Sequence, residues 1–283
     1  MPDVQFINQS LLSLLSKCGM MAYYRVVEGI REPPAIALIE GTAAHGGIGA
    51  NLSEKIATGA LLPEEAVADV AANTFQREWD GREGDPVLDE DERRMGIDRV
   101  LGQSKDRAVR MAVQHARVIA PTIEPIAVER EIVVDVPGFP YKIKGTLDVQ
   151  ERTRIRDSKT SGKKKTQRDA ERSVQLAMYT ELVRIADGVA PTEVCLDVMI
   201  KPTTSGRVDT QVLIAPAPTD PEPLRRRIEA AAHVLHSGAF YPVDPTGPGA
   251  WICTEKFCGY YHRCPYGARA QVVIPAPDLG GDE

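Results

Sequence analysis

The residues best suited to chemistry lie between positions 141 and 179, where acidic and basic side chains follow short apolar runs. Two extended segments, 141–149 and 154–159, flank a polar turn and predict a β-hairpin. If residues whose numbers sum to 305 face one another, Asp148 stands opposite Asp157. Directly opposed side chains have Cβ atoms about 5 Å apart, so both carboxylates can bind one cation. Lys159 lies two residues beyond Asp157 and therefore on the same face of its strand.

Paired carboxylates of this kind predict a site for Mg²⁺ or Mn²⁺, which prefer oxygen ligands. A divalent ion there would neutralise a phosphodiester and activate a bound water. We expect Lys159 to position that water or to stabilise developing charge. A free base is not expected, because the pKa of an unperturbed lysine is about 10.4. The prediction depends on the register, since a slip of one residue turns one strand's side chains to the other face.

The segment after Lys159 is the most basic short run in the chain, Lys163-Lys164-Lys165-Thr166-Gln167-Arg168. Beside a metal site it can neutralise backbone phosphates without reading base identity, although a solvated loop has the same composition. A helix expected over 170–185 places Gln175 and Tyr179 four residues apart, next to an apolar stripe.

The carboxylates belong to a motif of their own, and two further motifs accompany it. Asp148, followed by Asp157-Ser158-Lys159, resembles the signature of the PD-(D/E)XK nucleases. Gln175 and Tyr179, spaced as QxxxY, resemble the additional motif of the RecB-like exonuclease branch. Upstream, residues 41–45 (GTAAH) resemble the GxxxH motif of that branch. The resemblance implies a restriction-endonuclease-like α/β (α+β) fold, in which a mixed central sheet is flanked by helices.

The resemblance also implies roles for individual residues. His45 would join the two aspartates at the metal ion, and the backbone carbonyl of Ser158 would be a further ligand. Gln175 and Tyr179 would contact the scissile strand or orient Lys159. A lone histidine on a helix is more often an ordinary packed or exposed residue, so this role depends on the motif.

Three of the five cysteines, Cys253, Cys258 and Cys264, cluster near the end of the chain, and Cys18 is the candidate fourth ligand. Four thiolates suit either Zn²⁺ or an iron–sulfur cluster, and the spacing alone does not decide between them. RecB-like nucleases use one N-terminal and three C-terminal cysteines, so the resemblance implies a structural [4Fe–4S] cluster. The gap between the first two C-terminal cysteines is longer here than the usual Cys-x2-Cys. Cys195 lies in an apolar run and is expected to be a core residue.

Composition indicates an ordinary globular protein of 283 residues, with 43% hydrophobic and 26% charged residues. The formal charge of −6 argues against a generally basic nucleic-acid coat but leaves room for a local basic groove. No apolar run is long enough for a membrane span. The N-terminus lacks the pattern of a secretory signal, so we expect a cytoplasmic protein, in the bacterial host cytoplasm if it is phage-encoded.

We expect one nuclease domain over 1–283. Its parts are a mainly helical region (1–125, with Cys18 and His45), a catalytic region (126–240) and a cysteine segment (241–283). The pattern predicts helices over 6–27 (starting after Asn8), 35–56, 91–119 and 221–236, and strands from 126 and over 193–201 and 208–215. Glu129 and Glu131 are expected to face solvent, although either could add a carboxylate to the site. Gly145 is expected to mark a bulge or an approach for DNA.

The resemblance implies a metal-dependent exonuclease that acts on single-stranded DNA or duplex ends in recombination or end processing. It is similar to the nucleases of CRISPR adaptation and their phage relatives. No helicase motif is present, so a helicase or recombinase partner would supply unwinding. One alternative is an endonuclease or branched-DNA nuclease of the same fold. The other is a zinc-stapled, non-catalytic DNA-binding module, against which the retention of His45, Asp148, Asp157 and Lys159 argues.

Overall fold

The computed structural model describes residues 5–82, 84, 86–88, 90–135, 138, 140–202, 206–244 and 246–267. These residues form two compact units. The larger unit comprises residues 5–9 and 33–232, and the smaller unit comprises the described residues of 10–32 and 233–267. The assignment of the whole chain to one nuclease domain stays a prediction.

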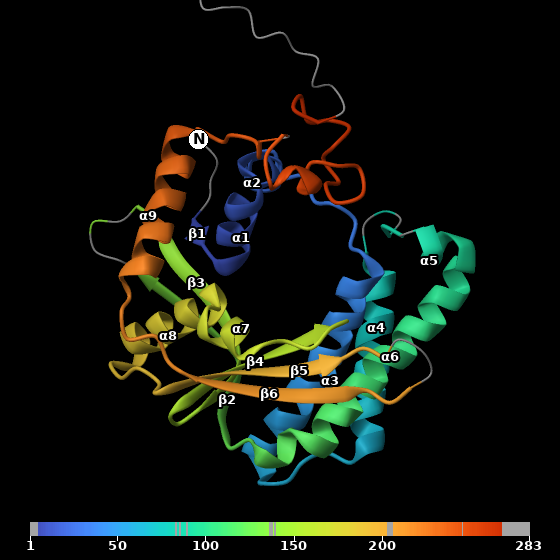
Figure 1. Ribbon diagram of the computed structural model, residues 1–283. Coiled ribbons are helices and arrows are strands. Elements are labelled where there is room, and N and C mark those ends of the chain that lie inside the picture. The colour runs from blue at the N-terminus through green and yellow to red at the C-terminus, as the bar shows by residue number, and fades with distance from the viewer. Residues whose placement is uncertain are drawn as a thin grey trace, which may run out of the picture. The chain divides into compact units, whose positions relative to one another are not determined.

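The larger unit is built on a six-stranded mixed sheet, as predicted (Figure 1). The strand order is β1-β3-β4-β5-β6, and β2 also pairs with β3. The pairs β1–β3 and β4–β5 are parallel and the other pairs are antiparallel. The strands are β1 (Phe6–Ile7), β2 (Pro125–Asp135), β3 (Lys142–Glu151), β4 (Arg154–Ser161), β5 (Glu193–Ile200) and β6 (Asp209–Pro216).

The hairpin of β3 and β4 has the predicted register. Val149 pairs with Arg156 and Gln150 pairs with Ile155, and the residue numbers of each pair sum to 305. The two strands pair only over these residues, after which β3 continues beside β2 and β4 continues beside β5. The sheet therefore forks at Asp148 and Asp157, which are the next residues in this register.

Helices cover the sheet of this unit. They are α3 (Ile36–Thr58), α4 (Glu64–Asp80), α5 (Glu90–Met95), α6 (Ile97–Val118), the 3₁₀ turn η1 (Ala120–Thr122), α7 (Gln167–Glu171), α8 (Val174–Asp187) and α9 (Glu222–Ser237), whose end belongs to the smaller unit. Figure 1 shows α3, α4 and α6 gathered beside the sheet on the side away from α7 and α8. Ala44, Ile48 and Leu52 of α3 pack on Met111 of α6 and Val149 of β3, which anchors α3 to the sheet.

Glycines in α3 lower its intrinsic helix propensity, and close packing explains one of them. A Cβ atom on Gly47 would lie 2.9 Å from the Cβ of Ala112 and 3.1 Å from the Val67 carbonyl, so α4 and α6 approach α3 closely there. Gly145 has a similar role in β3. A Cβ there would lie 2.5 Å from Cδ1 of Leu182, so the glycine lets α8 pack on the sheet and does not mark the bulge or DNA approach that we expected.

Two expected helices are broken in the structure. The helix expected over 6–27 is instead strand β1 followed by α1 (Gln9–Lys17) and α2 (Gly19–Val26), because Cys18 has an extended backbone with φ −164°. The helix expected over 91–119 is interrupted at Gly96, whose φ of 86° is unfavourable for other residues. The apolar residues keep a helical spacing across both breaks, so the sequence pattern predicted unbroken helices.

The smaller unit brings together segments from both parts of the chain, with α1, α2 and the 3₁₀ turn η2 (Ala250–Ile252). Its core contains Tyr24 and Tyr260, whose rings stack with centroids 5.1 Å apart, and three of the cysteines. Across the described segments of the chain, no helix combines the length and the apolar character that crossing a bilayer requires.

Candidate active site

The first part of the site joins α3 to the fork of the sheet. Nδ1 of His45 lies 3.4 Å from Oδ2 of Asp148. The same carboxylate oxygen accepts a hydrogen bond of 2.7 Å from the backbone N–H of Ser158. Asp148 on β3 therefore holds β4 at the point where backbone pairing of the two strands stops, and it holds His45 beside them.

A chain of polar contacts continues from β4 to α8. Nζ of Lys159 lies 3.0 Å from Oδ1 and 2.8 Å from Oδ2 of Asp157, which confirms that the two side chains share one face. The ammonium group also donates to Oε1 of Gln175 at 2.8 Å. Nε2 of Gln175 donates to the Tyr179 hydroxyl at 2.7 Å. Lys159 is thus fixed from two sides, and the structure brings all six predicted site residues into one region.

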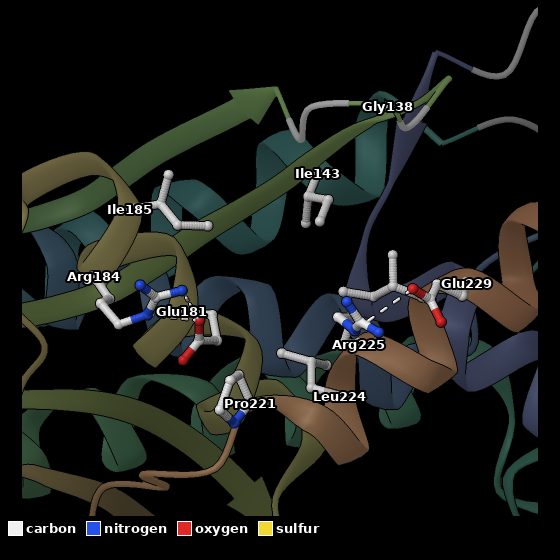
Figure 2. Close-up of a pocket in the computed structure, with 10 residues that line it drawn as sticks. Gly138, Ile143, Glu181, Arg184, Ile185, Pro221, Leu224, Arg225 and Glu229 are labelled. Atoms are coloured by element: carbon white, nitrogen blue, oxygen red, sulfur yellow. Dashed lines mark hydrogen bonds and ion pairs between the residues drawn. The ribbon is translucent and has the colours of Figure 1, made fainter.

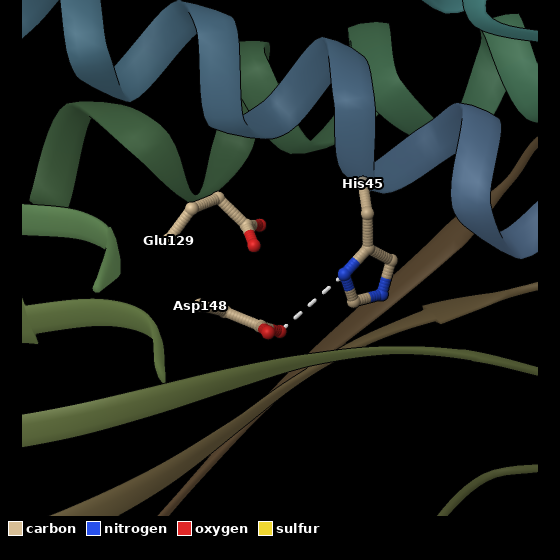
Figure 3. Close-up of side chains that lie close together, drawn as sticks. All are labelled: His45, Glu129 and Asp148. Carbon is tan, nitrogen blue, oxygen red and sulfur yellow. Dashed lines mark ion pairs between the residues drawn. The ribbon is translucent and has the colours of Figure 1, made fainter. Parts of the chain in front are cut away.

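Glu129 belongs to this region as well. One ligand atom each from His45, Glu129 and Asp148 lie within 4.8 Å of one another, and Figure 3 shows the three side chains pointing toward a shared space. Asp157 is not part of this compact group, because its carboxylate faces Lys159. Glu131, by contrast, pairs with Lys144 at 2.7 Å on the exposed face of the sheet. Glu129 is solvent-exposed, as expected, but it lines the cleft, so for this residue the structure favours the alternative that it adds a carboxylate to the site.

The acidic groups of the site destabilise one another. Burial raises the pKa of Asp148 to about 6. Burial, followed by the charge of Asp148, raises the pKa of Asp157 to about 7 and that of Glu129 to about 7. Burial also lowers the pKa of His45, which leaves its imidazole neutral and able to bind a cation. A cation placed among these groups would reverse the shifts of the carboxyl groups.

An open cleft of about 680 Å³ gives access to this cluster. One wall is α3, with Gly41, His45 and Gly49, and the floor includes Glu129, Asp148 and Lys159. The basic run after Lys159 adjoins this region in sequence, and within it Lys164 is paired with Asp209 at 3.2 Å.

A second hollow of about 330 Å³ lies on α8 and α9 (Figure 2). Its interior is mainly apolar, with Ile143, Ile185 and Leu224 among the lining residues. The arginines at its edge already have carboxylate partners: Arg184 lies 2.6 Å from Glu181, and Arg225 lies 3.6 Å from Glu229. This hollow is therefore less suited to binding phosphate or metal ions than the cleft at Asp148.

The smaller unit contains Cys18, Cys253, Cys258 and Cys264, the four predicted cluster ligands, and all are free thiols. Cys18, Cys258 and Cys264 are buried in one core, and Cys253 is partly exposed. Gly19, which follows the first cysteine, is required by packing, since a Cβ there would lie 2.5 Å from the Tyr241 carbonyl oxygen.

The pKa shifts of these thiols reflect how near they lie to one another. Burial raises the pKa of Cys253, and the charges of Cys264 and Cys18 raise it further. Burial raises the pKa of Cys258 to about 11. Cys195, in contrast, lies in β5 of the larger unit, where burial and Asp197 raise its pKa, and it is the core residue that the sequence predicts.

The sheet forks at Asp148, β4 carries Asp157 and Lys159, and α3 carries His45. This arrangement agrees with the family comparison. Residues 7–265 match the family model described as "PD-(D/E)XK nuclease superfamily". This match covers most of the chain, which therefore belongs to the PD-(D/E)XK nuclease superfamily.

Two solved structures are similar to this chain. One, from Eubacterium rectale, is described as a "Putative exonuclease"; it has a TM-score of 0.50 and 11% sequence identity, covering 84% of each chain. The other is described as SSO0001, with a TM-score of 0.41 and 15% identity, covering 94% of this chain and 88% of that one. The first similarity shows a shared fold. Comparison with curated proteins gives no match.

Proposed function

We propose that this chain is a divalent-metal-dependent DNA exonuclease that acts on single strands or duplex ends in recombination or end processing. The observation that carries the proposal is the meeting of His45, Asp148, Asp157 and Lys159 at the fork of the sheet, beside an open cleft. A helicase or recombinase would act with it, and the RecB-like branch, which includes phage-encoded nucleases, is the functional model that its motifs suggest.

The residues present fit Mg²⁺ or Mn²⁺. They offer carboxylate oxygens and one neutral imidazole, and one donor atom each of His45, Glu129 and Asp148 lie within 4.8 Å of one another. His45, Asp148 and Asp157 would hold the ion, with the Ser158 carbonyl as a further candidate. When bound, such an ion neutralises phosphate charge and makes bound water a nucleophile.

The chain's own residues would orient the reacting groups. Lys159, fixed by Asp157 and Gln175, presents an ammonium group toward the cleft, where it would donate to the scissile phosphate or to the attacking water. Tyr179 holds the Gln175 amide and thereby orients Lys159 indirectly. The lysines at 163–165 would neutralise phosphates along the strand, which gives affinity without sequence preference.

Digestion of linear and circular single-stranded DNA in Mg²⁺ tests this function. An exonuclease needs an end, so we expect linear DNA to be degraded to short products while circles stay intact, as followed on denaturing gels. Cutting of circles would indicate an endonuclease, and intact DNA in both formats would indicate the non-catalytic binding module. Either result would contradict the proposal.

The same proposal includes a structural [4Fe–4S] cluster bound by Cys18, Cys253, Cys258 and Cys264. Four thiolates around Zn²⁺ at about 2.3 Å lie less than about 4 Å apart. Of the residues that the structure describes, those that meet in threes within 4.8 Å include no cysteine. The burial of three of the thiols suits either group, so the choice of the iron–sulfur cluster rests on the resemblance to RecB-like nucleases.

Iron content tests this assignment. Anaerobically purified protein should be brown and carry about four iron atoms per chain. Cys258→Ser should lose most of that iron, because it removes a buried ligand, whereas Cys195→Ser should keep it, since Cys195 lies in the core of the other unit. Iron analysis and the visible spectrum give the result. Colourless protein with stoichiometric zinc would exclude the cluster.

A further inference from the structure

We infer that Glu129 is an additional ligand of the divalent ion at the nuclease site, a role that rests on the proposed metal-dependent function. The D…DxK, GxxxH and QxxxY motifs of this chain do not include this residue. It lies on β2, which carries none of the motifs.

The register of β2 places Glu129 beside Asp148. Val128 pairs with Val149 and Arg130 pairs with Leu147, so the residue between them stands opposite Asp148. Opposed residues of an antiparallel pair have Cβ atoms about 5 Å apart and point to the same face of the sheet. Glu129 therefore adds a carboxylate beside Asp148 across β2 and β3, as Asp157 does across β3 and β4.

The backbone at Glu129 is unusual. Its φ of 49° is in the left-handed region, which side chains with a Cβ rarely adopt. Its side chain reaches the wall of the cleft formed by α3, where Oε1 lies 3.8 Å from the position that a Cβ on Gly49 would take. This is an ordinary van der Waals distance, so the carboxylate lies against α3 among the residues that line the cleft.

The donor atoms suit one coordination shell. Atoms of His45, Glu129 and Asp148 lie within 4.8 Å of one another, and neighbouring ligands of an ion with bonds of about 2.1 Å lie roughly 3–4 Å apart. Figure 3 shows the Glu129 and Asp148 carboxylates both directed toward the imidazole. Within the described part of the chain, Glu129 has no hydrogen bond or ion pair that would account for its position.

Charge supports the same conclusion. Two carboxylates, from Glu129 and Asp148, meet beside His45, and the ammonium group of Lys159 in the same cleft is already paired with Asp157. An excess of negative charge in a partly buried site is stabilised by a bound cation. The ion that Glu129 would help to bind is therefore a hard divalent cation such as Mg²⁺ or Mn²⁺.

Binding of Mn²⁺ to EDTA-stripped protein tests the inference without an activity measurement. Calorimetry or EPR of free Mn²⁺ should give a Kd at least about 10-fold higher for Glu129→Gln than for the wild type, as expected for loss of a ligand. Glu131→Gln is the matched control on the same strand, because Glu131 pairs with Lys144 away from the site, and its Kd should stay within about 2-fold of the wild type. Thermal melting checks that each variant is folded.

Two further variants make the result decisive. Glu129→Gly removes the carboxylate and suits the left-handed backbone, so it should melt at or above the wild-type temperature and still bind Mn²⁺ weakly. Asp148→Asn should lose Mn²⁺ binding altogether. If Asp148→Asn loses binding while both Glu129 variants bind like Glu131→Gln, the role of Glu129 is overturned and the proposed function stands. If the wild type binds no Mn²⁺, the proposed metal site fails as a whole.

Discussion

Replacement of Asp157 by Asn should lower the rate of Mg²⁺-dependent DNA cleavage by roughly 10²–10³-fold, the range that loss of one transition-state stabilising group causes. Asp157 is fully buried and is the carboxylate nearest to Lys159. The substitution removes a proposed metal ligand and leaves the lysine without its charged partner. Single-turnover cleavage of end-labelled DNA measures the effect.

The same variant should remain folded. Burial and Asp148 raise the pKa of Asp157 to about 7, above the value of about 3.9 in an unfolded chain. The charged form therefore costs stability in the metal-free protein as pH rises through this range, and a neutral Asn avoids that cost. We expect Asp157→Asn to melt at or above the wild-type temperature in EDTA. Asp209→Asn, at an exposed position on β6, is the control that should keep full activity. Undiminished cleavage by Asp157→Asn would contradict the assignment.

Removal of Asp197 should cause the largest loss of stability in the larger unit. Arg156 is 2% exposed, and its guanidinium donates to Asp197 at 2.8 Å and to Glu151 at 2.7 Å. Asp197→Ala leaves this buried cation with Glu151 as its remaining carboxylate partner, which costs about 3–5 kcal/mol of unfolding free energy. Urea denaturation measures it.

A double variant separates the cost of the unpaired charge from that of lost packing. Arg156→Met combined with Asp197→Leu replaces both charges by apolar groups of similar size, and such replacements are often neutral or stabilising. The unfolding free energy of the double variant should therefore be closer to that of the wild type than the unfolding free energy of Asp197→Ala is. Glu222→Ala, which breaks exposed ion pairs on α9, should cost less than about 1 kcal/mol. A loss of less than about 1 kcal/mol for Asp197→Ala would show that Arg156 finds another partner or water.

The register of β3 and β4 could be predicted because it follows from local features. Strand alternation and a short polar turn leave few alternatives, and a slip of one residue would turn Asp157 and Lys159 to the face opposite Asp148. The pairs Val149–Arg156 and Gln150–Ile155 confirm it. Asp157 and Lys159 then share a face as a consequence of the strand period.

The position of Glu129 could not be predicted in the same way. Its left-handed backbone is not favoured by its residue type, so it must be imposed by the packing of β2 against β3 and α3. Similarly, the break at Cys18 occurs within an apolar pattern that reads as one helix, and only contact with distant residues, such as Tyr241 against Gly19, requires it. The sequence predicts a strand from Ile126, and pairing this strand with β3 in the observed register would have placed Glu129 opposite Asp148.

We propose that the carboxylates at the fork of the sheet bind the ion on which DNA cleavage depends. Cleavage of linear single-stranded DNA should be followed for EDTA-stripped wild-type protein and Asp157→Asn, before and after Mg²⁺ is restored. We expect no cleavage by either protein in EDTA, and recovery on adding Mg²⁺ for the wild type alone. Cleavage in EDTA, or equal recovery by the two proteins, would show that cleavage does not require an ion at this site.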